Sequence, residues 1–115
     1  MNQWPLESLA LCRMASGHLY LKLTKNINWE TFPNFATALL KSIGGKIDNK
    51  IESMDIRLWE VTLMGANLNV VFDDYPLMVS IESTDHAGDI VITRLHEQFK
   101  QKMGSGVRQV KARCL

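Results

Sequence analysis

The sequence is poor in the residues that mark several specialised classes of protein. It has two cysteines, Cys12 and Cys114, and three histidines in 115 residues. The cysteines lie near opposite ends of the chain and share no metal-binding or redox spacing, so we expect two unpaired thiols. No uninterrupted apolar run approaches the roughly 18 residues that a bilayer-spanning helix needs. We therefore expect neither a disulfide scaffold nor a membrane partner.

Charge of either sign is not in large excess, and no targeting signal is visible. Residues 1–8 lack the basic head and apolar stretch of a secretory signal, so we expect a cytoplasmic protein. The net charge is +1, but residues 94–115 contain six basic side chains and one acidic one. We predict one domain over residues 1–103, because its composition is that of a globular chain. Residues 104–115 are predicted to form a basic, flexible C-terminal tail.

Motifs for metal, phosphate or nucleophilic chemistry are also missing. The candidate metal ligands are His18, His86, His96, Asp85 and Asp89. His86 and His96 are ten residues apart on one predicted helix and cannot share a metal ion, and a pairing of His86 with Asp89 alone is not a site. The glycines of residues 44–46 follow a predicted helix, which is typical of a helix C-cap and not of a phosphate loop. The sequence has no nucleophile elbow. We predict no metal, no cofactor, no catalytic residue and no enzyme activity.

Carboxylates are the one residue type that leaves room for catalysis. Asp73 and Asp74 share a predicted turn, and Asp55 and Glu82 lie near it on the predicted sheet. Acid–base catalysis would require at least two of these groups in a deep pocket, with one of them desolvated. Aspartates in turns are usually solvated and stabilise the turn. A small enzyme using these carboxylates is therefore the third-ranked hypothesis.

The central feature of the sequence is the stretch from residue 56 to residue 83, which predicts three antiparallel strands. Apolar side chains alternate with others along each run, which is the period of a strand. The predicted inward faces carry Trp59, Val61 and Leu63, then Leu68, Val70 and Phe72, then Leu77, Val79 and Ile81. Residues 65–67 and 73–76 are the predicted turns between the strands.

The remaining chain predicts two helices and further strands. Strands are expected at residues 7–14 and 18–24, helices at 26–45 and 86–102, and either an edge strand or a loop at 46–53. Asn28 and Asp85 are the expected N-caps, because their side chains can accept amides of the first helical turn. Pro33 is best placed in a first turn, which leaves a start of the first helix nearer Phe32 as the alternative. The element order is ββα(β)βββα. It predicts an α+β fold: a two-layer sandwich with an antiparallel sheet of five or six strands and two helices packed on one face.

A sheet covered on one face leaves its second face open for contacts. The side chains predicted there are aromatic, apolar and charged, a mixture that suits a protein interface. The candidate interface residues are Tyr20, Lys22, Asn69, Val71 and Met78. We therefore predict a non-catalytic protein-binding or regulatory module whose partner is another protein or a second copy of the chain, as in a homodimer.

The alternative function is nucleic-acid binding through the C-terminal tail. Arg108, Lys111 and Arg113 follow the predicted hinge at residues 104–106 and are the candidate phosphate contacts. The sequence shows no RNA-binding aromatic pair, zinc finger or helix-turn-helix. Nucleic acid is therefore the second choice of partner.

Two segments resemble a known group of proteins. The first is NWETFPNFATALLKSIGG and the second is LWEVTLMGANLNVVFDDYPLMVSIES, which is followed by an amphipathic helix. Together they resemble a bacterial family of short proteins of unknown function, over residues 29–99. The family has no established activity, so the resemblance assigns no role to any residue, and the basic tail from Gly104 falls outside it.

Overall fold

The computed structural model describes residues 9–74 and 77–103. Its elements follow the predicted order, with residues 46–52 forming a strand. The elements are β1 (Ala10–Arg13), β2 (Leu19–Thr24), α1 (Phe32–Ile43), β3 (Lys46–Glu52), β4 (Ile56–Leu63), β5 (Ala66–Asp74), β6 (Leu77–Ser83) and α2 (His86–Met103).

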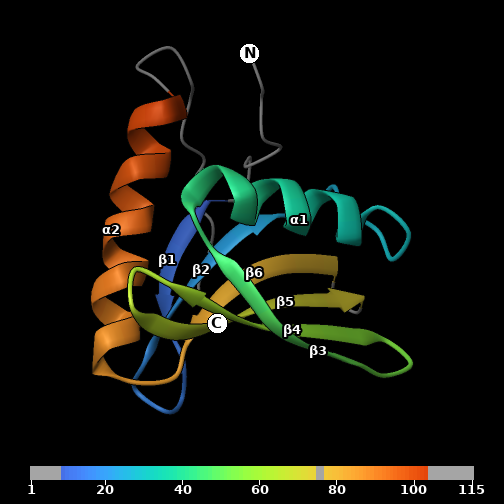
Figure 1. Cartoon of the computed structure of the whole chain (residues 1–115), viewed down its shortest axis with the longest axis horizontal. Helices are drawn as coiled ribbons and strands as arrows, with labels where there is room; N and C mark the ends of the chain where they lie inside the picture. Colours follow the sequence, from blue (N-terminus) through green and yellow to red (C-terminus); the bar gives the residue numbers. More distant parts are fainter. Residues whose placement is uncertain (1–8, 75–76, 104–115) are drawn as a thin grey trace.

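The strands form one six-stranded sheet in the order β1-β2-β6-β5-β4-β3, and every neighbouring pair is antiparallel. Strands β4, β5 and β6 make the predicted meander, while the β1–β2 hairpin joins the sheet beside β6. Because the order places β1 and β3 at the two edges, the middle of the sheet consists of β6 and β5 (Figure 1). The predicted α+β architecture is confirmed.

Both helices pack on the same face of the sheet and share one hydrophobic core with it (Figure 1). The Phe32 ring of α1 lies 5.1 Å from the Trp59 ring on β4 and 5.5 Å from the Phe72 ring on β5. Val91, Ile92, Leu95 and Phe99 supply the buried stripe of α2. Burying each of these side chains contributes about 1.5–3 kcal/mol. The contacts of both helices with the sheet therefore stabilise their packing.

The predicted inward faces of the strands are confirmed by burial and by strand register. Leu21, Ile81, Val70 and Trp59 lie opposite one another across β2, β6, β5 and β4. All four are buried. The same alternation turns the side chains between them toward the other face, which neither helix covers.

The two expected helix caps have different outcomes. Asp85 is confirmed, because its Oδ1 accepts the Gly88 N–H at 2.8 Å. The expectation for Asn28 is wrong: α1 begins four residues later, and its N-cap is Thr31, which makes no side-chain cap bond. The Asn28 Oδ1 instead accepts the N–H groups of Glu30 and Thr31, both at 2.9 Å, and stabilises a turn ahead of the helix.

The first meander turn is shifted from its predicted place. Met64 and Gly65 both have positive φ, 52° and 79°, which is the pattern of a two-residue type I′ hairpin. Ala66 and Asn67, predicted as turn residues, begin β5. Asp73 and Asp74 end β5, and the rest of the second predicted turn, residues 75–76, lies outside the described residues.

Two further expectations change with the structure. The first strand spans four residues rather than the predicted eight. Cys12 is disulfide-bonded, so the expectation of unpaired thiols is wrong for this residue. Cys114 and the predicted tail at 104–115 lie outside the described residues. Within the described part of the chain, neither helix has the length and apolar composition needed to cross a bilayer.

Candidate functional site

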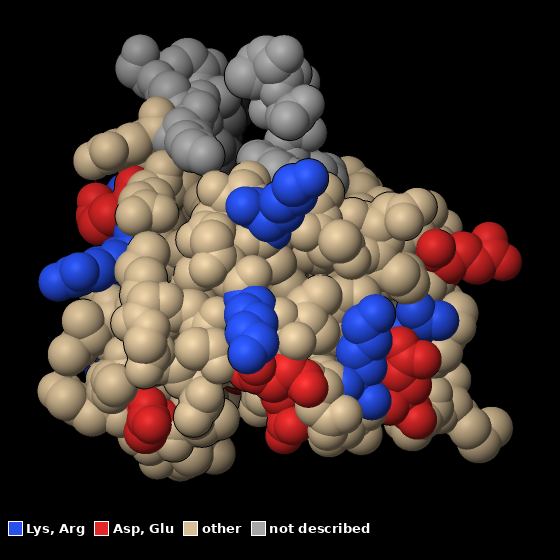
Figure 2. All heavy atoms as spheres, in the orientation of Figure 1, with Lys and Arg blue, Asp and Glu red and all other residues tan. Residues whose placement is uncertain are grey.

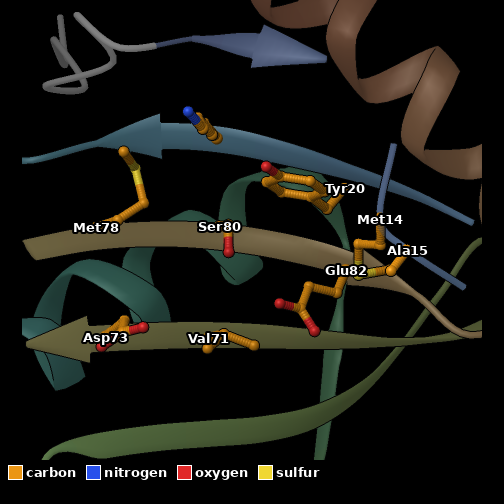
Figure 3. Close-up of a pocket in the computed structure, with 9 residues that line it drawn as sticks. Met14, Ala15, Tyr20, Val71, Asp73, Met78, Ser80 and Glu82 are labelled. Atoms are coloured by element: carbon orange, nitrogen blue, oxygen red, sulfur yellow. The ribbon is translucent and has the colours of Figure 1, made fainter. Parts of the chain in front are cut away.

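The sheet face opposite the helices, here called the open face, contains a hollow of about 390 Å³. Strands β2, β5 and β6 form its floor, and the β1–β2 connection closes one end (Figure 3). It is lined by Met14, Ala15, Tyr20, Lys22, Val71, Asp73, Met78, Ser80 and Glu82. This hollow is called the open-face hollow below.

Strand register explains why these side chains meet. Tyr20 on β2 lies opposite Glu82 on β6, and Ser80 lies between Lys22 on β2 and Val71 on β5. Because side chains two residues apart share a face, Ser80 and Glu82 point to the same side of β6. Figure 3 shows Ser80 between Met78 and Glu82, with Asp73 and Val71 on the adjacent strand.

Four of the five predicted interface residues line the open-face hollow: Tyr20, Lys22, Val71 and Met78. Asn69 lies on the same face, in register between Glu60 and Glu82, but outside the hollow. The structure thus places the five residues on one surface, and their role in binding remains a prediction.

Sequence reasoning missed Met14 and Ala15, which line the end of the hollow near the β1–β2 connection. They lie in a turn beside a short strand, and nothing in that local sequence predicts that they line a hollow. Glu82 was considered among the carboxylates, and alternation along β6 also predicted it on the same face as Met78. The strand that lies beside β6 could not be predicted.

Glu82 is a partly buried carboxyl group in the hollow. Burial raises the pKa of its carboxyl group above the ordinary value, and the negative charge of Asp73 raises it further. A carboxylate in such a place is stabilised by a cation, because the cation replaces part of the lost hydration. Lys22 and Asp73, which also line the hollow, each take part in a further interaction.

The walls around Glu82 are largely apolar. Met14, Val71 and Met78 supply aliphatic and thioether surface, and Tyr20 supplies an aromatic ring. Flexible methionine side chains adapt to ligands of different shape. Apolar surface beside a carboxylate suits a side chain with an aliphatic stem and a positive head, such as lysine or arginine.

The carboxylates of the enzyme hypothesis are only partly brought together. Asp73 and Glu82 both line the open-face hollow, whereas Asp55 and Asp74 do not. Among residues 9–74 and 77–103, His, Cys, Asp and Glu form no group of three that could hold a metal ion. The arrangement offers two carboxylates, a tyrosine and a serine on an open-sided surface.

The histidine and aspartate considered as metal ligands have another use. His18 Nδ1 lies 3.0 Å from Asp89 Oδ2, and the Leu19 N–H donates to Asp89 Oδ1 at 2.9 Å. These bonds lower the pKa of Asp89, the bond to His18 contributing most. The His18–Asp89 pair therefore connects the β1–β2 hairpin to α2. The partner of Asp89 is His18 and not His86, the residue considered from the sequence.

Charged side chains on the helix-bearing side of the molecule do not gather by sign. Figure 2 shows lysine and arginine interspersed with aspartate and glutamate over the described part of this face. A surface of mixed sign gives little net attraction for a phosphate backbone. The candidate phosphate contacts Arg108, Lys111 and Arg113 lie outside the described residues.

Comparison with known proteins gives a family but no activity. The model of the family described as Protein of unknown function (DUF3630) matches residues 9–99. The chain belongs to this family. The match to DUF3630 spans all six strands and most of α2, so the open-face hollow falls within it. No curated protein and no solved structure matches the chain.

Proposed function

We propose that this DUF3630 protein is a non-catalytic binding module that contacts another protein through the open face. The observation that carries the proposal is the open-face hollow, in which apolar side chains surround the half-buried carboxyl group of Glu82. The partner that suits it presents a lysine or arginine side chain in an exposed segment. Burial makes an ionised Glu82 costly in the free protein, and a bound cation offsets that cost.

The absence of catalysis is part of the proposal. General acid–base work needs a carboxyl group positioned against a reacting atom in a site that excludes water. The open-face hollow lies on the surface of the sheet and is lined in part by Tyr20 and Met78. Aromatic residues and methionine are enriched at protein interfaces. A binding role therefore requires less of the hollow than catalysis does, because it needs neither a positioned reacting atom nor the exclusion of water.

Selection from random displayed peptides tests this function. Peptides are selected on the wild-type protein and their binding to two variants is then compared. Glu82→Gln removes the charge inside the hollow, and Glu97→Gln removes an exposed carboxylate of α2 that pairs with Lys100. We expect selected peptides rich in lysine or arginine that bind the Glu97→Gln variant normally and bind the Glu82→Gln variant at least tenfold more weakly.

The opposite pattern would refute the basic partner segment. Peptides without a basic side chain, or peptides that bind Glu82→Gln as tightly as wild type, would show that Glu82 is not the recognition group. A pull-down with quantitative identification of co-purifying proteins, repeated with both variants, then connects the peptide preference to a natural partner.

The second candidate function is nucleic-acid binding through Arg108, Lys111 and Arg113. Its only support is the concentration of basic residues in the sequence. Affinity for nucleic acid should fall steeply with salt and should vanish when residues 104–115 are deleted. An unchanged complex after that deletion would eliminate this candidate.

We also propose a bacterial cytoplasmic location. Its bacterial part is supported by the resemblance of residues 29–99 to a bacterial family. The disulfide at Cys12 argues against its cytoplasmic part, because such bonds are rare in reducing compartments. Because Cys12 is buried in the folded chain, cells are quenched in acid and the thiols are alkylated after denaturation. A modified Cys12 thiol supports a cytoplasmic location, and a Cys12 that is modified only after reduction contradicts it.

A further inference from the structure

Strand β3 is an exposed edge of the sheet. It pairs with β4 on one side, and no described strand pairs with its other side. Six of its seven residues are exposed, and Ile51 retains 49% of its accessible surface. Long edge strands with unpaired backbone groups are templates for pairing with a second chain.

Backbone geometry shows which residues present their hydrogen-bonding groups outward. Ser53 N–H donates to Ile56 O on β4 at 2.9 Å, so the backbone groups of Ser53 face β4. Because this direction alternates along an antiparallel strand, Ile51 also faces β4, and Lys50 and Glu52 face outward. A second strand can therefore form its closest hydrogen-bonded pairs with Lys50 and Glu52.

Among the registers centred on residues 50, 51 and 52, the charges of Lys50 and Glu52 favour one for pairing with an identical strand. In a two-fold antiparallel arrangement centred on Ile51, each Lys50 lies opposite Glu52 of the other copy. A register centred on Lys50 or on Glu52 would place like charges opposite each other, which is destabilising. Within one copy Lys50 Nζ already lies over the Trp59 ring and Glu52 pairs with Arg57, so the contacts between copies would be shared with these partners.

The apolar residues of the open face agree with the same register. Ile51 lies opposite Leu58, and Leu58 lies opposite Val71, so the three form a row across β3, β4 and β5. Pairing about Ile51 would join this row to its copy and remove the exposed end of the row from water. Cross-strand apolar pairs of this kind contribute about 0.2–1 kcal/mol each.

We infer that the chain forms a two-fold homodimer by antiparallel pairing of β3 with β3 of a second copy, centred on Ile51. The two six-stranded sheets become one continuous sheet, with both open faces on the same side. The pairing does not depend on what the open-face hollow binds, since β3 contributes no residue to it.

Engineered cysteines test the register directly. The two Ile51 positions form a non-hydrogen-bonded pair with Cα atoms about 4.5 Å apart, which is close enough for a disulfide. The two Asn49 positions are about 14 Å apart in the same register. Under mild oxidation we expect the Ile51→Cys variant to cross-link to a covalent dimer and the Asn49→Cys variant to remain at the wild-type background. Equal cross-linking at both positions would overturn the proposed register.

Sedimentation equilibrium tests the dimer without engineered thiols. We expect the wild-type protein to reach twice the 13.1 kDa mass of one chain. The Lys50→Glu variant should be monomeric, because it places carboxylates opposite each other. Lys46→Glu is the matched control on the same exposed strand and should remain dimeric. A wild-type mass of one chain at every concentration, or a dimeric Lys50→Glu variant with normal folding, would overturn the proposal.

Discussion

His18 Nδ1 lies 3.0 Å from Asp89 Oδ2, although 71 positions separate the two residues in the chain. The same carboxylate accepts the Leu19 N–H, so one side chain of α2 holds both a side chain and the backbone at the start of β2. Asp89 also lies in the first turn of α2, where the helix dipole favours negative charge. This contact is a specific connection between the helical layer and the β1–β2 hairpin.

Replacing Asp89 by asparagine should make stability depend less on pH. The pKa of Asp89 is lowered in the folded protein, so its carboxylate stabilises the fold above the unfolded value, near about pH 4. That stabilisation is lost as the pH falls through the lower, folded value. Denaturant unfolding of wild type and Asp89→Asn should therefore show a gap in the free energy of unfolding at neutral pH that narrows in acid. A gap of constant size at every pH would contradict the role given to the carboxylate.

The cap of α2 makes a separate prediction with a matched control. Asp85 Oδ1 accepts the Gly88 N–H, and loss of such a cap typically costs about 1 kcal/mol. Asp85→Ala should lower the free energy of unfolding by about this amount, whereas Asp85→Asn should retain most of it because asparagine caps equally well. Thermal unfolding followed by circular dichroism measures both. Equal losses in the two variants would show that the negative charge matters rather than the hydrogen bond.

Gly88 should resist replacement by alanine even though alanine favours helices. A Cβ atom at this position would lie 2.6 Å from Ser83 Oγ and 3.0 Å from Leu68 Cδ2. Alanine gains about 1 kcal/mol of helix propensity, but overpacking of this kind typically costs about 1–3 kcal/mol. We expect Gly88→Ala to destabilise the protein in chemical denaturation. Addition of Ser83→Ala should recover part of the loss, and a fully additive pair would contradict the predicted clash.

Glu82 predicts the opposite pH trend from Asp89. Its pKa is raised in the folded protein by burial and by Asp73, so the folded state retains a proton to higher pH than the unfolded state does. Stability from this group is present below the unfolded value of about 4.3 and is lost as the pH rises through the folded value. Glu82→Gln should therefore be more stable than wild type at neutral pH and about equal to it in acid. A variant less stable than wild type at neutral pH would contradict this prediction and show that the ionised Glu82 stabilises the fold.

Short-range patterns in the sequence predicted most of the fold. Trp59, Val70 and Ile81 were assigned to the buried face because alternation is a local property of each strand. Asp85 was identified as a cap because the helix begins directly after it. By contrast, Asn28 was misassigned, since the turn that it stabilises and a helix start have the same local signature.

Long-range contacts could not be predicted in the same way. The open-face hollow depends on β2 lying beside β6, and nothing local in either strand specifies that neighbour. For the same reason the contact of His18 with Asp89 was invisible, although each residue was considered as a ligand. Tyr20 and Met78 could be assigned to the open face from alternation alone, but the position of Tyr20 opposite Glu82 required the strand order.

The central claim is that the open face, at the hollow around Glu82, is the surface that meets a partner. Amide chemical-shift mapping with a selected lysine- or arginine-containing peptide tests it most directly. The largest shifts should fall on Tyr20, Val71, Ser80 and Glu82, and they should disappear in the Glu82→Gln variant. Shifts concentrated on exposed residues of α2 such as Ile90 and Arg94, with none on the open face, would contradict it.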